Sequence, residues 1–261
     1  SGTVNLTVDS NSFVNALTIN QGIFSISGSG VRIGGTGTIT VQGPSGQLVI
    51  NDSIGAATAH LSGARPLTLV GGNFSFTGNT AGSAQTFASL TTGRGATNVI
   101  SSNQTGSGAV TLTFDRWNNN GDSSTLFQGT ALGTSANRIL FTNAPGAVST
   151  LGMVNNVVQR ATINGTDFVS YNHNGTASNT NGIQAFTAYN TSNSIDSVGT
   201  TTNVTMAITA TPVFTGASNR TVNALKINGS GINIGNGITN QIASLTLSAG
   251  AVINVGGHNT I

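Results

Sequence analysis

The chain has 261 residues, of which 5% are charged, and its formal net charge of +2 comes from 8 basic and 6 acidic side chains. It contains no cysteine and no glutamate, so disulfides and thiolate metal ligands are excluded. The basic residues lie singly and no run of about 18 apolar residues is present, so we expect neither nucleic-acid binding nor a membrane-spanning helix.

Short stretches in which apolar and polar residues alternate recur along the chain. The first runs from Thr3 to Asp9, where Val4, Leu6 and Val8 alternate with polar neighbours. Such alternation is typical of β-strands, and the Gly, Asn, Ser and Pro residues between the stretches are typical of turns. The hydrophobic content of 37% favours a folded chain, and no stretch has helical spacing, so the sequence predicts an all-β fold.

Apolar residues of these stretches recur at a nearly constant interval. One column of five residues has separations of 22, 21, 21 and 22 positions, and a second column has 22 and 22. This period predicts a right-handed parallel β-helix, or β-solenoid, with about 21–22 residues per coil and inward side chains stacked about 4.8 Å apart. The predicted columns are Ile26, Leu48, Leu69, Leu90 and Leu112; Leu17, Ile39 and Leu61; and, near the end, the pairs Leu225 with Leu247 and Ile234 with Val255.

The columns fade between residues 127 and 200, where aromatic residues are concentrated. Large side chains suit a compact core better than a thin coil, so we interpret this block as a hairpin-rich insertion. The predicted regions are solenoid coils in 1–128, an irregular β-rich insertion in 129–200, and solenoid coils again in 201–261. The aromatic residues concerned are Phe127, Phe141, Phe168, Tyr171, Phe186 and Tyr189.

One seven-residue segment occurs twice, at residues 14–20 (VNALTIN) and 222–228 (VNALKIN), with six of its seven residues identical. A Gly-Ser-Gly-Val or Gly-Ser-Gly-Ile stretch follows each copy. Internal self-similarity indicates a repeat architecture. A chain that ends in the module with which it begins is suited to head-to-tail stacking, which predicts a homopolymeric fibre.

Six short motifs span most of residues 110–261: Thr111–Phe114, Asn137–Phe141, Asn164–Phe168, Asn223–Ile227, Leu245–Gly250 and Gly256–Ile261. In this order they resemble the autotransporter-associated β-strand-repeat proteins, which are large surface proteins of bacteria. The resemblance implies a parallel β-helix, export and a role at the cell surface. It carries over no catalytic residue.

The acidic residues offer one candidate site for carbohydrate chemistry. Asp115 and Asp122 flank Arg116 and Trp117, the only place where two acids, a base and the sole tryptophan gather. Glycoside hydrolysis needs two carboxylates that face each other across a cleft, and the remaining aspartates are scattered. The alternative interpretation, which we favour, is an Asp115–Arg116 ion pair beside a Trp117 that covers the core.

No other residue pattern predicts catalysis or metal binding. His60, His173 and His258 are isolated and are expected at the surface or in turns, with no partner at metal-ligand spacing. No nucleophile-elbow signature accompanies them. We therefore expect no enzyme, no cofactor, and no catalytic, cofactor-binding or metal site.

These observations predict an extracellular structural protein that forms or extends a cell-surface fibre, or the stalk of an adhesin. Its expected partner is itself, head to tail, or flanking repeats of the same chain, and surface glycans are further candidates. The alternatives are a carbohydrate-cleaving β-helix with its site near Asp115 and Asp122, and a binding module in which Trp117, Tyr171 and Tyr189 stack on sugars.

Overall fold

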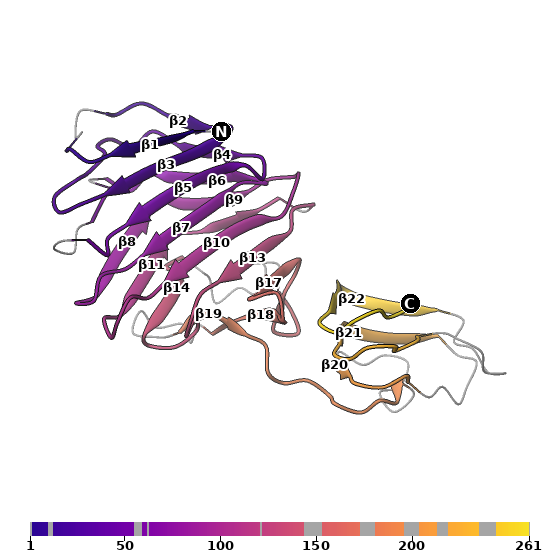
Figure 1. Ribbon diagram of the computed structural model, residues 1–261. Coiled ribbons are helices and arrows are strands. Elements are labelled where there is room, and N and C mark those ends of the chain that lie inside the picture. Colours follow the sequence, from indigo (N-terminus) through magenta and orange to yellow (C-terminus); the bar gives the residue numbers. More distant parts are fainter. Residues whose placement is uncertain are drawn as a thin grey trace. The chain divides into compact units, whose positions relative to one another are not determined.

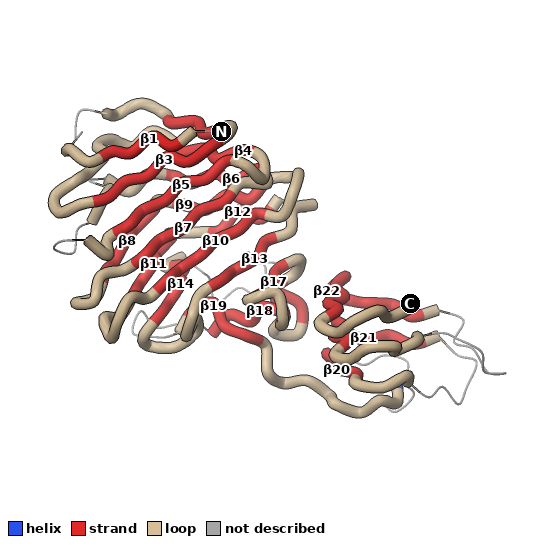
Figure 2. Tube along the Cα trace, in the orientation of Figure 1, coloured by secondary structure: helices blue, strands red, loops and turns tan. Residues whose placement is uncertain are grey.

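A computed structural model describes residues 2–9, 13–54, 59–61, 63–120, 122–143, 153–172, 181–195, 204–212, 219–234 and 244–260 (Figure 1). Strands, turns and loops make up this part of the chain, and it contains no α-helix (Figure 2). The chain divides into two compact units, one formed by residues 1–152 with 171–184 and the other by residues 153–170 with 185–261. The prediction of an all-β fold is confirmed.

The first unit is built from three ladders of parallel strands, which we call its first, second and third sheets. The first sheet is the row of slanted strands in Figure 1 and contains β1 (Thr3–Leu6), β3 (Gly22–Ser27), β5 (Gly46–Asn51), β7 (Asn73–Thr77), β10 (Asn98–Asn103) and β13 (Thr125–Gln128). The second contains β2 (Leu17–Ile19), β4 (Ile39–Gln42), β6 (Pro66–Val70), β9 (Ser89–Thr92) and β12 (Trp117–Asn119). The third contains β8 (Ser83–Phe87), β11 (Val110–Phe114) and β14 (Asn137–Phe141), with β19 (Gly182–Ala185) paired to β14 at Ile139 and Gly182.

The chain visits these sheets in rotation, for example through β6, β7 and β8 and then through β9, β10 and β11. Each circuit is one coil, and the whole is a β-solenoid of about seven turns. The predicted coil length of 21–22 residues is wrong for most coils. Leu48 pairs with Phe74, 26 positions later, and Leu112 pairs with Ile139, 27 positions later.

The predicted five-residue column does not exist, because its members lie in three different sheets. Ile26 and Leu48 belong to β3 and β5, Leu69 and Leu90 belong to β6 and β9, and Leu112 belongs to β11. All five are nevertheless fully buried. Each coil contributes inward apolar residues from three faces, so an interval of 21 or 22 positions connects residues on different faces.

The second predicted column is correct for its first step and wrong for its second. Leu17 pairs with Ile39, 22 positions later, but Ile39 pairs next with Leu67 rather than with Leu61. Leu61 instead bridges to Ile33. The loop between β5 and β6 lengthens this coil, so the pairing of residues no longer follows a constant interval.

Aromatic side chains fill the interior of the first unit. The rings of Phe74, Phe87, Phe114 and Phe141 follow one another with centroid distances of 5.2, 5.3 and 5.6 Å. Contacts of this geometry stabilise a core beyond the burial of area alone. A coil with three faces is therefore wide enough for aromatic residues, and our expectation that they indicate a separate compact insertion is wrong for Phe127 and Phe141, which lie in β13 and β14.

The second unit contains two antiparallel hairpins and one parallel sheet. The hairpins are β15 (Met153–Val154) with β16 (Val157–Val158), and β17 (Ala161–Ile163) with β18 (Asp167–Asn172). Their turns place Asn155, Asn156 and Asn164 at positive φ, a conformation that asparagine tolerates better than most residues. The prediction of hairpins within residues 129–200 is confirmed.

The parallel sheet of the second unit has the order β20 (Thr205–Ile208), β21 (Arg220–Ile227) and β22 (Leu245–Asn254). Leu225 pairs with Val252 rather than with the predicted Leu247, which is opposite Val222. Apolar clusters cover both faces of this sheet. Leu225 and Ile227 belong to one cluster, whereas Ala224 belongs to the other together with Phe168 and Phe186.

The repeated seven-residue segment, at residues 14–20 and 222–228, has matching local structure in the two units. Its first copy contains β2 and its second copy lies in β21, so both copies contribute a parallel strand. In the stretches that follow, Gly30 and Gly231 have φ angles of 75° and 72°, and the next residues, Val31 and Ile232, are buried. Glycine adopts such φ values with the least strain, which accounts for the second glycine of the shared Gly-Ser-Gly pattern.

Candidate functional site

The structure gives Asp115 and Asp122 separate partners. Asp115 Oδ2 accepts hydrogen bonds from Arg116 Nε and Nη2, both at 3.2 Å. Asp122 forms an exposed ion pair with Arg94. The predicted ion pair between Asp115 and Arg116 is therefore confirmed, and each carboxylate already has a cationic partner.

Trp117 is part of the core. Its side chain is 3% exposed, its ring stacks on Phe141 at 5.8 Å, and its edge meets the ring of Phe127. The indole Nε1–H donates to Thr92 Oγ1 at 3.0 Å. A tryptophan whose faces and polar atom are all engaged cannot stack on a sugar, so its assignment to a carbohydrate platform is wrong.

The two tyrosines of the proposed sugar-binding surface are also engaged. Tyr171 is buried, and its hydroxyl donates to the carbonyl of Phe141 at 3.1 Å and accepts from the amide of the same residue at 2.9 Å. Tyr189 is half-buried and packs edge-on against Phe186. Burial raises the pKa of both phenols. Trp117, Tyr171 and Tyr189 therefore provide no exposed aromatic platform.

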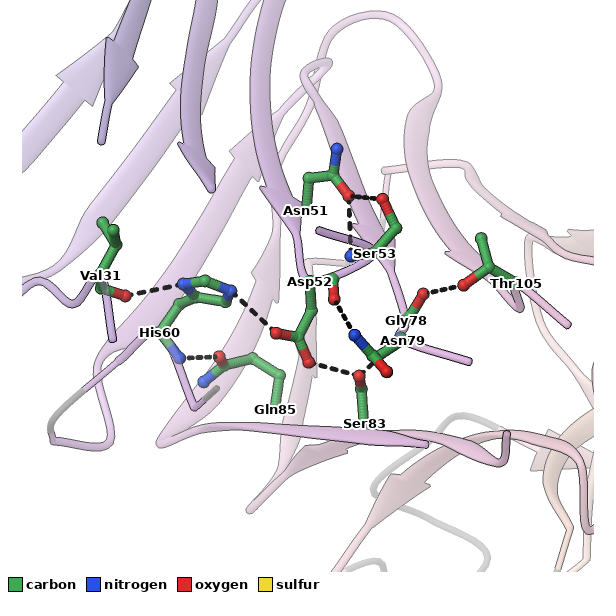
Figure 3. A network of polar contacts seen from close by, with 10 residues as sticks. All are labelled: Val31, Asn51, Asp52, Ser53, His60, Gly78, Asn79, Ser83, Gln85 and Thr105. Carbon is green, nitrogen blue, oxygen red and sulfur yellow. Dashed lines mark hydrogen bonds and ion pairs between the residues drawn. The ribbon is translucent and has the colours of Figure 1, made fainter. Parts of the chain in front are cut away.

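His60 belongs to a buried polar cluster that the sequence did not predict (Figure 3). Its ring Nδ1–H donates to the carbonyl of Val31 at 2.7 Å, and Nε2 faces Asp52 Oδ1 at 3.4 Å. Ser83 Oγ donates to the other oxygen of Asp52 and accepts from the amide of Asn79 at 2.8 Å. His60 lies in a bend, which fits the expectation of a surface or turn residue, but it is buried rather than exposed.

The order of groups in this cluster does not suit acyl transfer. In a Ser-His-Asp arrangement the histidine lies between the nucleophile and the acid, whereas here Asp52 lies between Ser83 and His60. A depression of about 400 Å³ borders Asp52 and Ser83, but its remaining walls are formed by small residues and Thr111. The cluster connects the segments that carry Val31, Asp52, His60 and Ser83, and we assign it a structural role.

Of the other two histidines, the structure describes one. His258 is exposed, as predicted, and its carbonyl accepts a hydrogen bond from the amide of Gly231 at 2.8 Å. His173 lies outside the described residues.

Arg65 is a second buried polar residue that the sequence did not indicate. Its side chain is 0% exposed, and the guanidinium donates to the carbonyls of Gly37, Gly34, Phe13 and Asn15. Burial lowers the pKa of Arg65. The planar five-donor fork satisfies carbonyls from several loops at once, so Arg65 joins the first coils of the solenoid.

Among the described residues, no strand pairs with the outer edge of β1. Val4 on β1 pairs with Phe24, which pairs in turn with Leu48 and then Phe74. Leu48 and Phe74 are fully buried, but Val4 is 61% exposed. A groove of about 630 Å³ lies beside β1 and β2, and its apolar lining residues are Val4, Leu17, Ile19, Ile23 and Phe24. This surface is an apolar cross-section of the coil.

The last strand of the second unit presents a similar end. Met206 and Leu225 are fully buried, and the next residue in their column, Val252 on β22, is 43% exposed. Among the described residues, β21 is the only strand paired with β22, and β3 is the only strand paired with β1. In each unit, therefore, an edge strand of a parallel ladder carries an exposed valine in line with the core.

Two further classes of site are not found among the residues that the structure describes. No group of three or more His, Cys, Asp or Glu side chains is arranged to hold a metal ion. None of the elements described is a helix with the length and apolarity needed to cross a membrane. No protein-family model, curated protein or solved structure matches the chain.

Proposed function

We propose that this chain is a structural protein in which solenoid units stack head to tail to form or extend a fibre or stalk. The observation that carries the proposal is the pair of uncovered column ends at Val4 and Val252. An exposed edge strand pairs readily with another chain, and solenoids in isolation normally carry polar caps. Neither β1 nor β22 carries a charged residue.

The occupant of the β1 end is a second copy of the chain, contributed through β22. In the first unit the coils follow β1, and in the second unit they precede β22. The β22 strand of one copy can therefore lie parallel to β1 of the next copy, as neighbouring strands do in the existing ladders. The contact joins two different surfaces and is heterologous. Contacts of this kind propagate into filaments unless the geometry closes a ring.

The described interior favours a structural role. Three of its polar side chains are buried and make hydrogen bonds to other parts of the solenoid, namely His60, Asp52 and Arg65. The resemblance to autotransporter-associated β-strand-repeat proteins adds a setting to this proposal, which is the outer surface of a bacterial cell. In that setting the fibre or stalk is extracellular, and surface glycans are its candidate ligands.

The alternative, a carbohydrate-cleaving or carbohydrate-binding β-helix, has less support because Trp117 is buried. It is tested by incubating the chain with a panel of polysaccharides and comparing it with Asp115→Asn and Asp122→Asn variants. Under the structural proposal the panel is left intact. Turnover that one of these substitutions abolishes would establish the alternative.

Assembly is tested by sedimentation velocity over a range of concentrations and by electron microscopy of the same samples. We expect the chain to form larger species as its concentration rises, with filaments visible in the micrographs. Val4→Asp places a carboxylate at the end of the apolar column and should leave a folded monomer, because burying an unpaired charge in the contact is costly. A chain that stays monomeric at every concentration contradicts the proposal.

Val4→Leu is the matched control, because it retains an apolar group at the same exposed position. Val252→Asp provides a second and independent test at the other end. If the contact is heterologous, a mixture of Val4→Asp and Val252→Asp chains still forms dimers, through the intact end of each. A two-fold symmetric contact made by β1 alone would instead leave Val252→Asp fully competent.

A further inference from the structure

Lys226, the only lysine of the chain, lies against Asp167 in the second unit. Lys226 Nζ is 2.5 Å from Asp167 Oδ1, and the two side chains are 13% and 24% exposed. The residues are 59 positions apart, with Lys226 in β21 and Asp167 at the start of β18. We propose that these side chains condense to an intramolecular amide, an isopeptide crosslink between the hairpin and the sheet.

The surroundings of the pair are apolar. Lys226 pairs with Ala207 on one side and with Ile253 on the other, and both are largely buried. The neighbouring cluster contains Phe168 and Phe186. This packing holds the amine against the carboxyl group of Asp167. The neutral amine is the form that can act as a nucleophile.

Tyr189 is placed to assist the condensation. Its hydroxyl donates to Asp167 Oδ1 at 3.1 Å and accepts from the amide of Phe168 at 3.3 Å, and Lys226 Nζ lies 5.1 Å from the centre of its ring. Burial raises the pKa of the phenol, so it keeps its proton and remains a donor. A donor directed at a carboxyl oxygen polarises the group and stabilises the negative charge that develops there on attack.

The reaction needs only these groups. Lys226 Nζ passes one proton to the carboxylate, and its lone pair then attacks Asp167 Cγ to form the carbon–nitrogen bond. A second proton moves from nitrogen to the departing oxygen, the carbon–oxygen bond breaks, and one water molecule leaves. The amide nitrogen retains the third proton. The fold supplies the driving force by holding the reacting groups in contact, which replaces a bimolecular encounter by an intramolecular one.

The crosslink would close a covalent loop that ties the β17–β18 hairpin to the β20–β21–β22 sheet. Asp167 Oδ2 also accepts from Thr166 Oγ1 at 3.1 Å, so the carboxyl group is held at both oxygens before reaction. A covalent link between distant positions stabilises a fold by restricting its unfolded chain. This property suits the proposed load-bearing fibre, but the crosslink does not depend on assembly.

The test is the intact mass of the purified full-length chain, measured under denaturing conditions after incubation in the folded state. We expect a mass lower than that of the sequence by one water molecule, and a proteolytic fragment in which residues 167 and 226 are joined. Wild-type chain at the full sequence mass overturns the proposal, because the pair is then an ion pair only.

Three variants separate the crosslink from other losses of water. Lys226→Arg keeps the positive charge but has no amine to condense, and Asp167→Ala has no carboxyl group, so both should retain the full mass. Loss of water that persists in Lys226→Arg would assign it to another residue and refute the crosslink. Tyr189→Phe keeps the ring but removes the donor, and we expect a smaller crosslinked fraction at equal times.

Discussion

His60 Nε2 lies 3.4 Å from Asp52 Oδ1 in the interior of the first unit, and the exposed fractions of the two side chains are 0% and 1%. The other ring nitrogen donates to Val31 and the other carboxyl oxygen accepts from Ser83. Each group therefore bridges two segments of the solenoid. A buried cluster of this kind is stabilising only while its members remain paired.

Replacing Asp52 with alanine removes the centre of this cluster. Ser83 then loses its buried acceptor and His60 loses its carboxylate neighbour, so we expect the free energy of unfolding to fall by about 1–3 kcal/mol. The measurement is chemical denaturation of the wild type and the variant. Asp122→Ala is the control, because its ion pair with Arg94 is exposed and should contribute little. Equal effects of the two substitutions would contradict the assigned role of the cluster.

The fold class could be predicted from the sequence, but the coil length could not. Alternation of apolar and polar residues indicates strands, and a repeated interval between apolar residues indicates stacked coils. The interval that we identified joins Leu48 to Leu69, which lie in β5 and β6, whereas the residue stacked on Leu48 is Phe74. With three inward faces in every coil, many apolar pairs share an interval without sharing a face.

Sequence patterns did not predict which polar residues are buried. Asp52, His60 and Ser83 come together through the packing of separate segments, and no spacing along the chain predicts this. Lys226 and Asp167 are likewise joined by tertiary packing across 59 positions. The local prediction for Asp115 and Arg116 succeeded because the two residues are adjacent in the sequence.

Leu69→Asp should be among the most destabilising substitutions in the first unit. Leu69 is fully buried between Val41 and Thr92 of adjacent coils, where a carboxylate would find neither water nor a cation. We expect the variant to be unfolded or to lose most of its stability in thermal denaturation. Thr68→Asp, at the neighbouring and partly exposed position of the same strand, is the control. Unchanged unfolding of Leu69→Asp would contradict the stacked core.

Arg65→Lys should loosen the first coils although it preserves the charge. Lysine carries a single ammonium group and cannot satisfy the carbonyls of Phe13, Asn15, Gly34 and Gly37 that the guanidinium fork reaches. We expect faster hydrogen exchange in residues 13–37 and a loss of at least about 1 kcal/mol of stability. Arg116→Lys, at a largely exposed position, should leave exchange unchanged. Unaltered exchange in Arg65→Lys would show that the carbonyl contacts are dispensable.

Tyr171 makes the first unit sensitive to alkaline pH. Burial raises its pKa above the ordinary value of 10.0, so the unfolded state loses the phenolic proton at a lower pH than the folded state. The stabilisation is fully present below the unfolded pKa and is lost as pH rises through the folded pKa. Tyr171→Phe should lower stability at neutral pH, because both hydrogen bonds to Phe141 disappear, and should reduce the decline above pH 10.

Tyr189 should contribute to the same pH dependence, since its pKa is also raised by burial, and Tyr189→Phe tests this. Each single variant should remove part of the alkaline decline, and the double variant should remove more than either one. Denaturation midpoints measured from pH 8 to about 11 provide the comparison. An alkaline decline that is as steep in Tyr171→Phe as in the wild type would exclude this phenol as its source.

Asn5→Pro tests whether assembly uses the free edge of β1. The amide of Ile23 donates to the carbonyl of Gly2 at 2.9 Å, and residues along a parallel strand face its two neighbours alternately. The backbone groups of Thr3 and Asn5 therefore point away from β3, toward the position of an added strand. Proline at residue 5 removes an outward donor while leaving the ladder between β1 and β3 intact.

We expect the Asn5→Pro chain to keep the thermal stability of the wild type and to remain monomeric at concentrations at which the wild type assembles. Asn5→Ala is the matched control, because it loses the same side chain but retains the amide donor, and it should assemble normally. Val4→Pro removes a donor that faces β3 and should instead destabilise the first strand. Normal assembly of Asn5→Pro would show that backbone hydrogen bonds at this edge do not hold the copies together, and would leave apolar contact at Val4 as their means of association.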